Sequence, residues 1–214
     1  MAISKADFNN INITPTASKA IKWNASANGF EAGDLGGSMV LLSTQTASGS
    51  ATLSFTSGID DTYDSYVFKL INIHPATDDQ TLQFNMSVDG GSNYNVTKTT
   101  TFFRAYHDEG DGGAVLEYRA ANDLAQATGF QVLTTGSSNS NDACINSEFK
   151  IFSPSSTTFV KHFIARTVDL ATGEYAMDMY AAGYGNTTSA VDAIQFKMSS
   201  GNIDVGTIKM YGIT

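Results

Sequence analysis

The sequence predicts an all-β protein: a two-sheet antiparallel β-sandwich of the jelly-roll type, with an extended N-terminal arm and one short helix. Three observations predict this fold. Short runs that alternate between apolar and polar residues recur along the chain, which is the period of half-buried strands. Clusters of turn residues separate these runs at short intervals. Segments that could connect parallel strands through helices are scarce, so we expect the strands to be antiparallel.

The N-terminal residues predict an arm rather than a domain. Residues 1–37 show no sustained periodicity of apolar residues, so we expect them to be extended and to precede a sandwich domain at residues 38–214. Trp23 and Phe30 flank a polar run that is typical of a turn. Such an arm can lie on its own domain or on a neighbouring subunit. The candidate interface residues are its large apolar side chains: Phe8, Ile11, Ile13, Trp23 and Phe30.

Residues 63–88 contain the two longest strand-like runs. The first, residues 66–73, is apolar on both faces apart from Lys69, which suits a central strand covered on two sides. The second, residues 82–88, alternates strictly between apolar and polar side chains. Pro75 lies between them, where it fixes φ and cannot donate to a ladder, so we expect the two runs to form a hairpin.

Further strands are expected on both sides of that hairpin. Residues 39–42 and 51–55 predict two strands with a loop at residues 45–49. Residues 117–128 are the one segment with a helix-forming composition, and Gly129 is suited to end a helix there. The remaining predicted strands are residues 94–106, 145–152, 159–168, 175–182, 191–198 and 205–213.

Charge and composition exclude several classes of function. The formal net charge of -9 argues against nucleic acid as a partner, because phosphate binding needs a concentrated basic surface. No apolar run reaches the roughly 18 residues of a membrane span, so we expect no membrane contact. The single cysteine, Cys144, excludes an intrachain disulfide, and we expect it to be buried or half-buried. The first residues lack the apolar core of a secretion signal, so we expect synthesis in the cytoplasm.

No residue pattern predicts catalysis, a cofactor or a metal. His74, His107 and His162 do not combine with a nucleophile and an orienting acid, and we expect His162 to be half-buried. The acidic loop at residues 107–113 is the best calcium candidate. It lacks the ligand spacing of an EF-hand, so we interpret it as a solvated loop. We therefore expect a protein that is not an enzyme and uses no cofactor.

Tyrosines near strand ends leave sugar binding open. Exposed aromatic rings on a β-sandwich can stack on pyranose rings, whereas the alternative, which we favour, is that the tyrosines cover sheet edges with their hydroxyls in water. A sugar site would lie at a tip formed by the loops at residues 110–113 and 134–142. The tyrosines concerned are Tyr63, Tyr94, Tyr106, Tyr180 and Tyr184.

Five segments of the sequence carry a resemblance to known proteins: residues 9–20, 36–42, 63–78, 94–103 and 201–212. These segments resemble a family of structural proteins that recur in phages of marine bacteria and cyanobacteria. The resemblance covers nearly the whole length and is weaker at residues 110–143. It implies a virion component of the capsid surface or the tail, made as a homo-oligomer with a trimer favoured, and it brings no catalytic residues.

We therefore expect a non-enzymatic phage virion protein that decorates the capsid or forms part of the tail. Its arm would contact other virion proteins, namely the major capsid protein or tail proteins. The alternative is a carbohydrate-binding module of a tail fibre, which attaches the particle to a glycan of the host surface.

Overall fold

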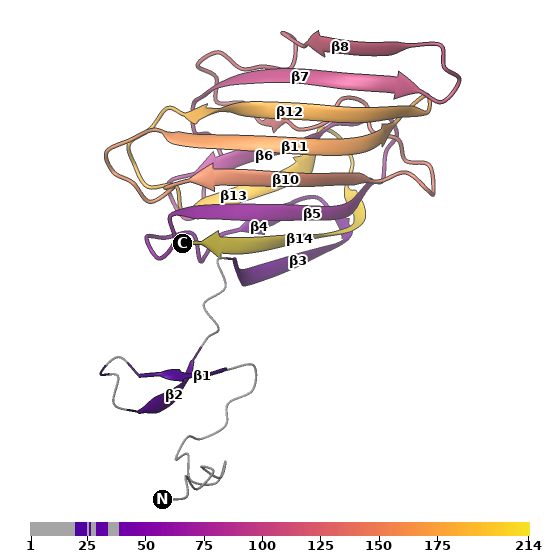
Figure 1. The fold of residues 1–214 in the computed structure, drawn as a ribbon. Helices are drawn as coiled ribbons and strands as arrows, with labels where there is room; N and C mark the ends of the chain where they lie inside the picture. Colours follow the sequence, from indigo (N-terminus) through magenta and orange to yellow (C-terminus); the bar gives the residue numbers. More distant parts are fainter. Residues whose placement is uncertain (1–19, 25, 27–28, 34–38) are drawn as a thin grey trace, which may run out of the picture. The chain divides into compact units, whose positions relative to one another are not determined.

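The computed structural model describes residues 20–24, 26, 29–33 and 39–214. The chain divides into two units, Met1–Ser38 and Met39–Thr214, and each is described by itself. The described residues form strands, turns and loops without any helix (Figure 1). None of the described segments therefore has the form of a membrane-spanning helix.

The described part of the first unit is a two-stranded antiparallel hairpin. β1 (Ala20–Trp23) pairs with β2 (Phe30–Gly33), with Trp23 opposite Phe30. The turn between them closes where the Asn24 N–H donates to the Gly29 carbonyl at 3.0 Å. The sequence predicted this turn but not the strands, because four residues are too few to show a period.

The second unit consists of two antiparallel sheets. The strands of the larger sheet are β3 (Val40–Ser50), β5 (Ser65–Pro75), β7 (Lys98–Asp108), β8 (Ala114–Tyr118), β10 (Ile145–Phe152), β11 (Lys161–Ala171), β12 (Tyr175–Gly185) and β14 (Ile203–Ile213). The strands of the smaller sheet are β4 (Leu53–Phe55), β6 (Leu82–Ser87), β9 (Gln131–Val132) and β13 (Ala193–Met198). Their orders are β3-β14-β5-β10-β11-β12-β7-β8 and β4-β13-β6-β9.

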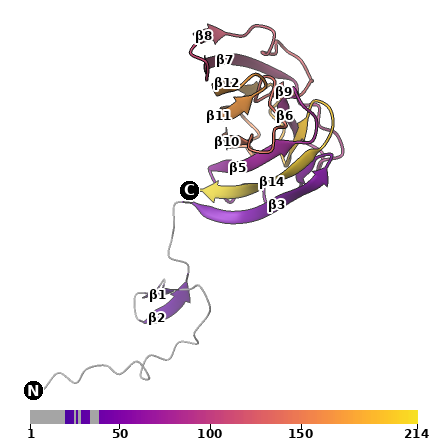
Figure 2. The same ribbon diagram turned by 90° about the vertical axis from the view of Figure 1, so that its right-hand side faces the viewer.

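Phenylalanine rings fill the space between the two sheets. Figure 2 shows the smaller sheet on one face of the larger one. Phe84 of β6 lies 4.5 Å from Phe149 of β10 and 4.8 Å from Phe163 of β11, measured between ring centroids. Phe196 of β13 lies 5.6 Å from Phe68 of β5. Two layers around one shared core are consistent with a β-sandwich.

The other face of the larger sheet is not covered by the smaller sheet. In β11 the burial alternates residue by residue: Phe163 and Ala165 are buried, whereas Ile164 and Arg166 are exposed. This alternation is the period-two pattern of a strand with one face in the core. We call the uncovered side the outer face of the larger sheet.

Most of the predicted strands are confirmed. β10 has the bounds that the pattern predicted, and β11 to β14 overlap the other predicted strands of the C-terminal half. β5 is a central strand between β14 and β10, as predicted. The predicted cover on both of its faces is incomplete, because Ile71 is 39% exposed.

The predicted hairpin of residues 66–73 with residues 82–88 is wrong. β5 belongs to the larger sheet and β6 to the smaller one, so the chain crosses between the layers after Pro75. Each strand carries an apolar face, and placing the strands in opposed layers buries those faces in one core. The predicted loop at residues 45–49 is also wrong, because these residues continue β3 in its pairing with β14.

The predicted helix at residues 117–128 does not form. After β8 the chain instead follows the first half of β7, where the Thr100 N–H donates to the Leu124 carbonyl at 2.9 Å. Lys98 and Ala127 exchange two backbone hydrogen bonds, of 2.8 and 3.1 Å. A helix here would leave these groups of β7 without partners, so tertiary pairing overrides the local helical composition.

We expect Phe84→Ala to lower the free energy of unfolding by about 3 to 5 kcal/mol, because it leaves a cavity among three packed rings. The control is Phe159→Ala, which removes the same atoms from a side chain that is 70% exposed and should change stability by less than about 0.5 kcal/mol. Urea unfolding measures both. Equal midpoints for the two variants would contradict this account of the core.

Candidate functional site

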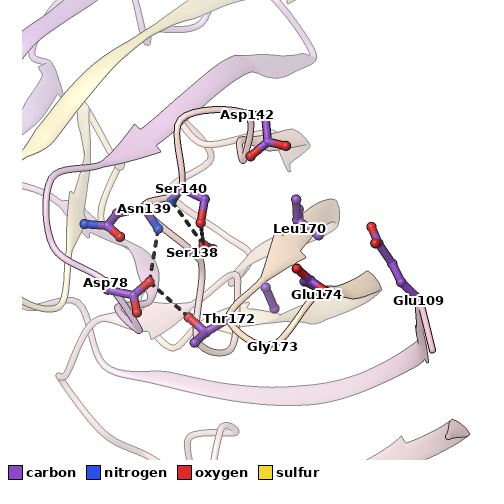
Figure 3. Close-up of a pocket in the computed structure, with 11 residues that line it drawn as sticks. Asp78, Glu109, Ser138, Asn139, Ser140, Asp142, Leu170, Thr172, Gly173 and Glu174 are labelled. Carbon is purple, nitrogen blue, oxygen red and sulfur yellow. Dashed lines mark hydrogen bonds between the residues drawn. The ribbon is translucent and has the colours of Figure 1, made fainter. Parts of the chain in front are cut away.

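Four loops at one end of the second unit line a cavity of about 380 Å³. They are the β5–β6, β7–β8, β9–β10 and β11–β12 connections, and they contribute Asp78, Glu109, residues 138–140, Asp142 and residues 172–174 (Figure 3). The structure therefore brings the predicted tip loops, residues 110–113 and 134–142, to the same end of the molecule.

Hydrogen bonds within this cavity hold the loops in place. Asp78 Oδ1 accepts from the Asn139 N–H at 3.1 Å and from the Thr172 hydroxyl at 3.2 Å (Figure 3). The Ser138 hydroxyl donates to Ser140 Oγ at 3.0 Å and accepts from the Ser140 N–H at 3.1 Å. These polar groups are thus engaged in loop structure. No aromatic residue lines the cavity, so it offers no ring for a sugar to stack on.

Within the described ranges, no group of three or more His, Cys, Asp or Glu side chains converges as a metal site would require. In the acidic loop, Asp108 Oδ1 accepts from the Gly112 N–H at 2.8 Å, and His107 Nε2 lies 3.2 Å from Asp111 Oδ1. These contacts give the acids of residues 107–113 a role in closing the turn.

A buried carboxyl group lies beneath the β9–β10 loop. Asp169 of β11 is 7% exposed, and its Oδ2 accepts a hydrogen bond of 2.7 Å from the Ser137 hydroxyl. Its Oδ1 has no partner among the described residues. Burial raises the pKa of Asp169 to about 6, and the hydrogen bond from Ser137 opposes that rise. Asp169 therefore links the loop to the sheet, and its contribution to the free energy of unfolding depends on pH.

Two buried lysines lie toward the other end of the same strands. Lys98 begins β7 and Lys161 begins β11, and both pair with Gly185 of β12. The Lys161 ammonium donates to the Ser156 and Phe159 carbonyls, each at 2.6 Å. Burial lowers the pKa of both lysines, that of Lys98 to about 8. Their amines satisfy loop carbonyls, which is a structural role.

Lys98 is held by a side-chain amide as well as by the backbone. Its ammonium donates to Asn85 Oδ1 at 2.5 Å and to the Val96 carbonyl at 2.6 Å. The Asn85 amide in turn donates to the Tyr94 carbonyl at 2.6 Å. The polar side of β6, which the sequence pattern predicted to be exposed, is buried at Asn85 because these loops cover it.

The structure separates the five candidate tyrosines. Tyr63 packs on Tyr66, with ring centroids 5.9 Å apart, and Tyr106 packs on Tyr175 at 5.3 Å. The rings of Tyr63 and Tyr106 lie against the core. The Tyr94 hydroxyl is buried.

The remaining two, Tyr180 and Tyr184, lie together on the outer face of β12. The face follows from the alternation of β12, in which Met179 and Ala181 are buried. Tyr180 is stacked on Phe103 of β7, with ring centroids 4.8 Å apart and planes at 6°. An aromatic surface is therefore present on the sheet, away from the loop end where the sequence placed a sugar site.

The three histidines lie apart and form no catalytic group with one another. His74 Nε2 is 3.2 Å from the Ser140 carbonyl oxygen, and its Nδ1 is 3.6 Å from Asp204 Oδ2. His162 was predicted to be half-buried, but it is exposed on the outer face of β11, because its neighbours Lys161 and Phe163 point inward. Cys144 is half-buried, as expected.

The hairpin exposes two of the five predicted interface residues. The rings of Trp23 and Phe30 stack with centroids 4.4 Å apart, and they are 61% and 46% exposed. Ile21, two residues before Trp23, shares their face and is 46% exposed. The opposite face carries an ion pair of 3.4 Å between Lys22 and Glu31. The hairpin is thus amphipathic. The other three predicted interface residues, Phe8, Ile11 and Ile13, lie outside the described residues.

No protein-family model matches the chain, and no curated protein matches it.

We expect Asp169→Asn to change how stability depends on pH. The raised pKa means that the folded state binds more protons than the unfolded state between about pH 4 and pH 6. The stabilisation is therefore complete below the unfolded pKa and is lost as the pH rises through about 6. Relative to that of the variant, the free energy of unfolding of the wild type should fall by up to about 3 kcal/mol between pH 4 and pH 7.

Urea unfolding at a series of pH values measures this difference. Asp142→Asn, at an exposed acid of the β9–β10 loop, is the control and should follow the wild-type curve. Parallel curves for the wild type and Asp169→Asn would show that the buried carboxyl group carries no such cost.

Proposed function

We propose that this chain is a non-enzymatic structural protein of a phage virion, placed on the capsid surface or in the tail, and that it assembles through contacts made by its N-terminal arm. The resemblance of several segments to phage structural proteins supports the class. The strand order and the exposed hairpin described above support it independently of that resemblance.

The order of the strands supports a jelly-roll connectivity. When β7, β8, β11 and β12 are set aside, the two sheets have the orders β3-β14-β5-β10 and β4-β13-β6-β9. The chain then changes sheet at every step except from β6 to β9, and its first and last strands, β3 and β14, are neighbours. This order matches the two Greek keys of a jelly roll, an architecture used by viral capsid and lectin domains. The four strands set aside extend one of its sheets.

The observation that carries the proposal is the amphipathic hairpin. A two-stranded hairpin is at best marginally stable in water, so β1 and β2 need a surface to cover their apolar face. Tryptophan and phenylalanine are typical anchors at the centre of protein interfaces. The stacked pair of Trp23 and Phe30 suits the contact between neighbouring subunits of a homo-oligomer, which we propose to be a trimer.

Substitution of both rings should dissociate this assembly. We expect the wild-type chain to be a trimer by light scattering at micromolar concentration and the double variant Trp23→Ser, Phe30→Ser to be a monomer, because the contact loses its two anchors. The control is Lys22→Ser with Glu31→Ser, which alters the other face of the hairpin and should stay trimeric. Circular dichroism checks that the sandwich remains folded. A monomeric wild type, or a Trp23→Ser, Phe30→Ser variant that remains trimeric, would contradict the proposal.

The second candidate is a carbohydrate-binding module that attaches the particle to its host. The placement of Tyr180 and Tyr184 on one uncovered sheet face favours it, because aromatic rings on a flat sheet can stack on pyranose rings.

Gel electrophoresis of the purified chain in the presence of soluble polysaccharides tests this candidate. We expect at least one polysaccharide to retard the chain relative to an inert marker protein. Unchanged migration with every polysaccharide would remove the candidate.

A further inference from the structure

The outer face of the larger sheet carries a groove across β7, β12 and β11. Strand register places Thr101, Ala182 and Ile164 in one row across these strands. The neighbouring row contains Tyr184 and His162, whose larger side chains form a wall. The resulting hollow has a volume of about 380 Å³ and includes Gly183, which carries no side chain.

A second wall, outside the residues that line the hollow, lies on the other side of the small row. It consists of the stacked rings of Phe103 and Tyr180, with the Arg166 guanidinium 5.3 Å from the centre of the Tyr180 ring. Tyr180 and Tyr184 are four residues apart on one strand, which separates the two walls by about 13 Å. A short oligosaccharide can contact both walls at this spacing.

The first wall offers polar atoms that the protein does not use. The rings of His162 and Tyr184 lie 6.0 Å apart, and neither the His162 nitrogens nor the Tyr184 hydroxyl has a hydrogen bond within the described residues. Ile164, which is 51% exposed, and Ala182 give the floor its apolar character. The groove therefore combines apolar surface with free donors and acceptors at its rim, as small-ligand sites do.

We propose that this groove binds pyranose residues of an uncharged glycan. This inference rests on the carbohydrate-binding candidate above and assigns its site. The apolar C–H face of a pyranose lies against Ile164, Ala182 and the Tyr184 ring, while its hydroxyls bond with His162 and Tyr184. Sugar hydroxyls both donate and accept, so they suit a rim whose atoms include both kinds of group.

An apolar protein anchor fits this groove less well than a sugar. Such an anchor would cover the free polar atoms of His162 and Tyr184 without replacing their bonds to water, and unpaired buried polar atoms are costly.

Charge selects an uncharged glycan. No carboxylate or ammonium group lines the hollow. Arg166, in the second wall, is held by Asp178 through two hydrogen bonds, of 3.0 and 2.9 Å. The net charge of -9 also disfavours an acidic polysaccharide.

The test uses two substitutions in the groove that leave the core residues unchanged. Ala182→Leu adds a larger side chain to the floor, and Tyr184→Ala removes the ring of the first wall. The matched control is Ala176→Leu, which adds the same atoms on the same face of the same strand, outside the hollow. The probes are the neutral polysaccharides dextran, laminarin and galactomannan, and the acidic polysaccharide alginate, each in affinity gel electrophoresis with the full chain.

We expect at least one neutral polysaccharide to retard the wild type and Ala176→Leu equally. Ala182→Leu should weaken binding about tenfold or more, because its side chain blocks access to the floor of the groove. Tyr184→Ala should weaken binding by a similar factor, because it removes a ring on which the sugar stacks. Retardation by any of the probes that Ala182→Leu leaves unchanged would overturn the groove while keeping the carbohydrate-binding candidate. Binding of alginate alone would overturn the assignment to an uncharged glycan. No retardation by any of the four would overturn both the groove and the candidate.

Discussion

The burial of phenylalanine rings between the two sheets is the constraint on which the rest of the structure depends. Side chains alternate along a strand, so each ring that points into the core fixes the direction of its neighbours. With Phe163 inward, His162 and Ile164 must lie on the outer face. A slip of one residue would bury both of them and expose the ring. The phenylalanine rings that share this core are Phe55, Phe68, Phe84, Phe102, Phe149, Phe163 and Phe196.

The ends of the sandwich are closed differently from its faces. Asp169 ties a loop to one end, and Lys98 and Lys161 bind loop carbonyls toward the other. Buried ionisable groups cost stability, as their shifted pKa values indicate, but each gives a loop one fixed position. The outer face of the larger sheet and the amphipathic hairpin are the two surfaces to which we assign partners.

The sequence predicts what is local and leaves out what depends on distant partners. Alternation located β10 and β11 because each strand has one buried face. It could not show that β5 and β6 lie in different sheets, since both arrangements bury the same residues. The helix-forming composition of residues 117–128 was misleading because the backbone of β7 needs that segment as a partner. The groove beside Tyr184 was invisible for the same reason: its row joins three strands by register. Trp23 and Phe30 were identified because large apolar residues in a polar segment need a surface.

Cysteine scanning along β12 tests the central claim that the buried rings fix which side chains face outward. In a Cys144→Ser background, single cysteines at residues 176–182 and 184 would be reacted with a water-soluble thiol reagent under native conditions. The account predicts fast labelling at positions 176, 178, 180, 182 and 184 and slow labelling at positions 177, 179 and 181. Uniform labelling, or fast labelling at the odd positions, would contradict the register, and with it the groove and the sandwich described here.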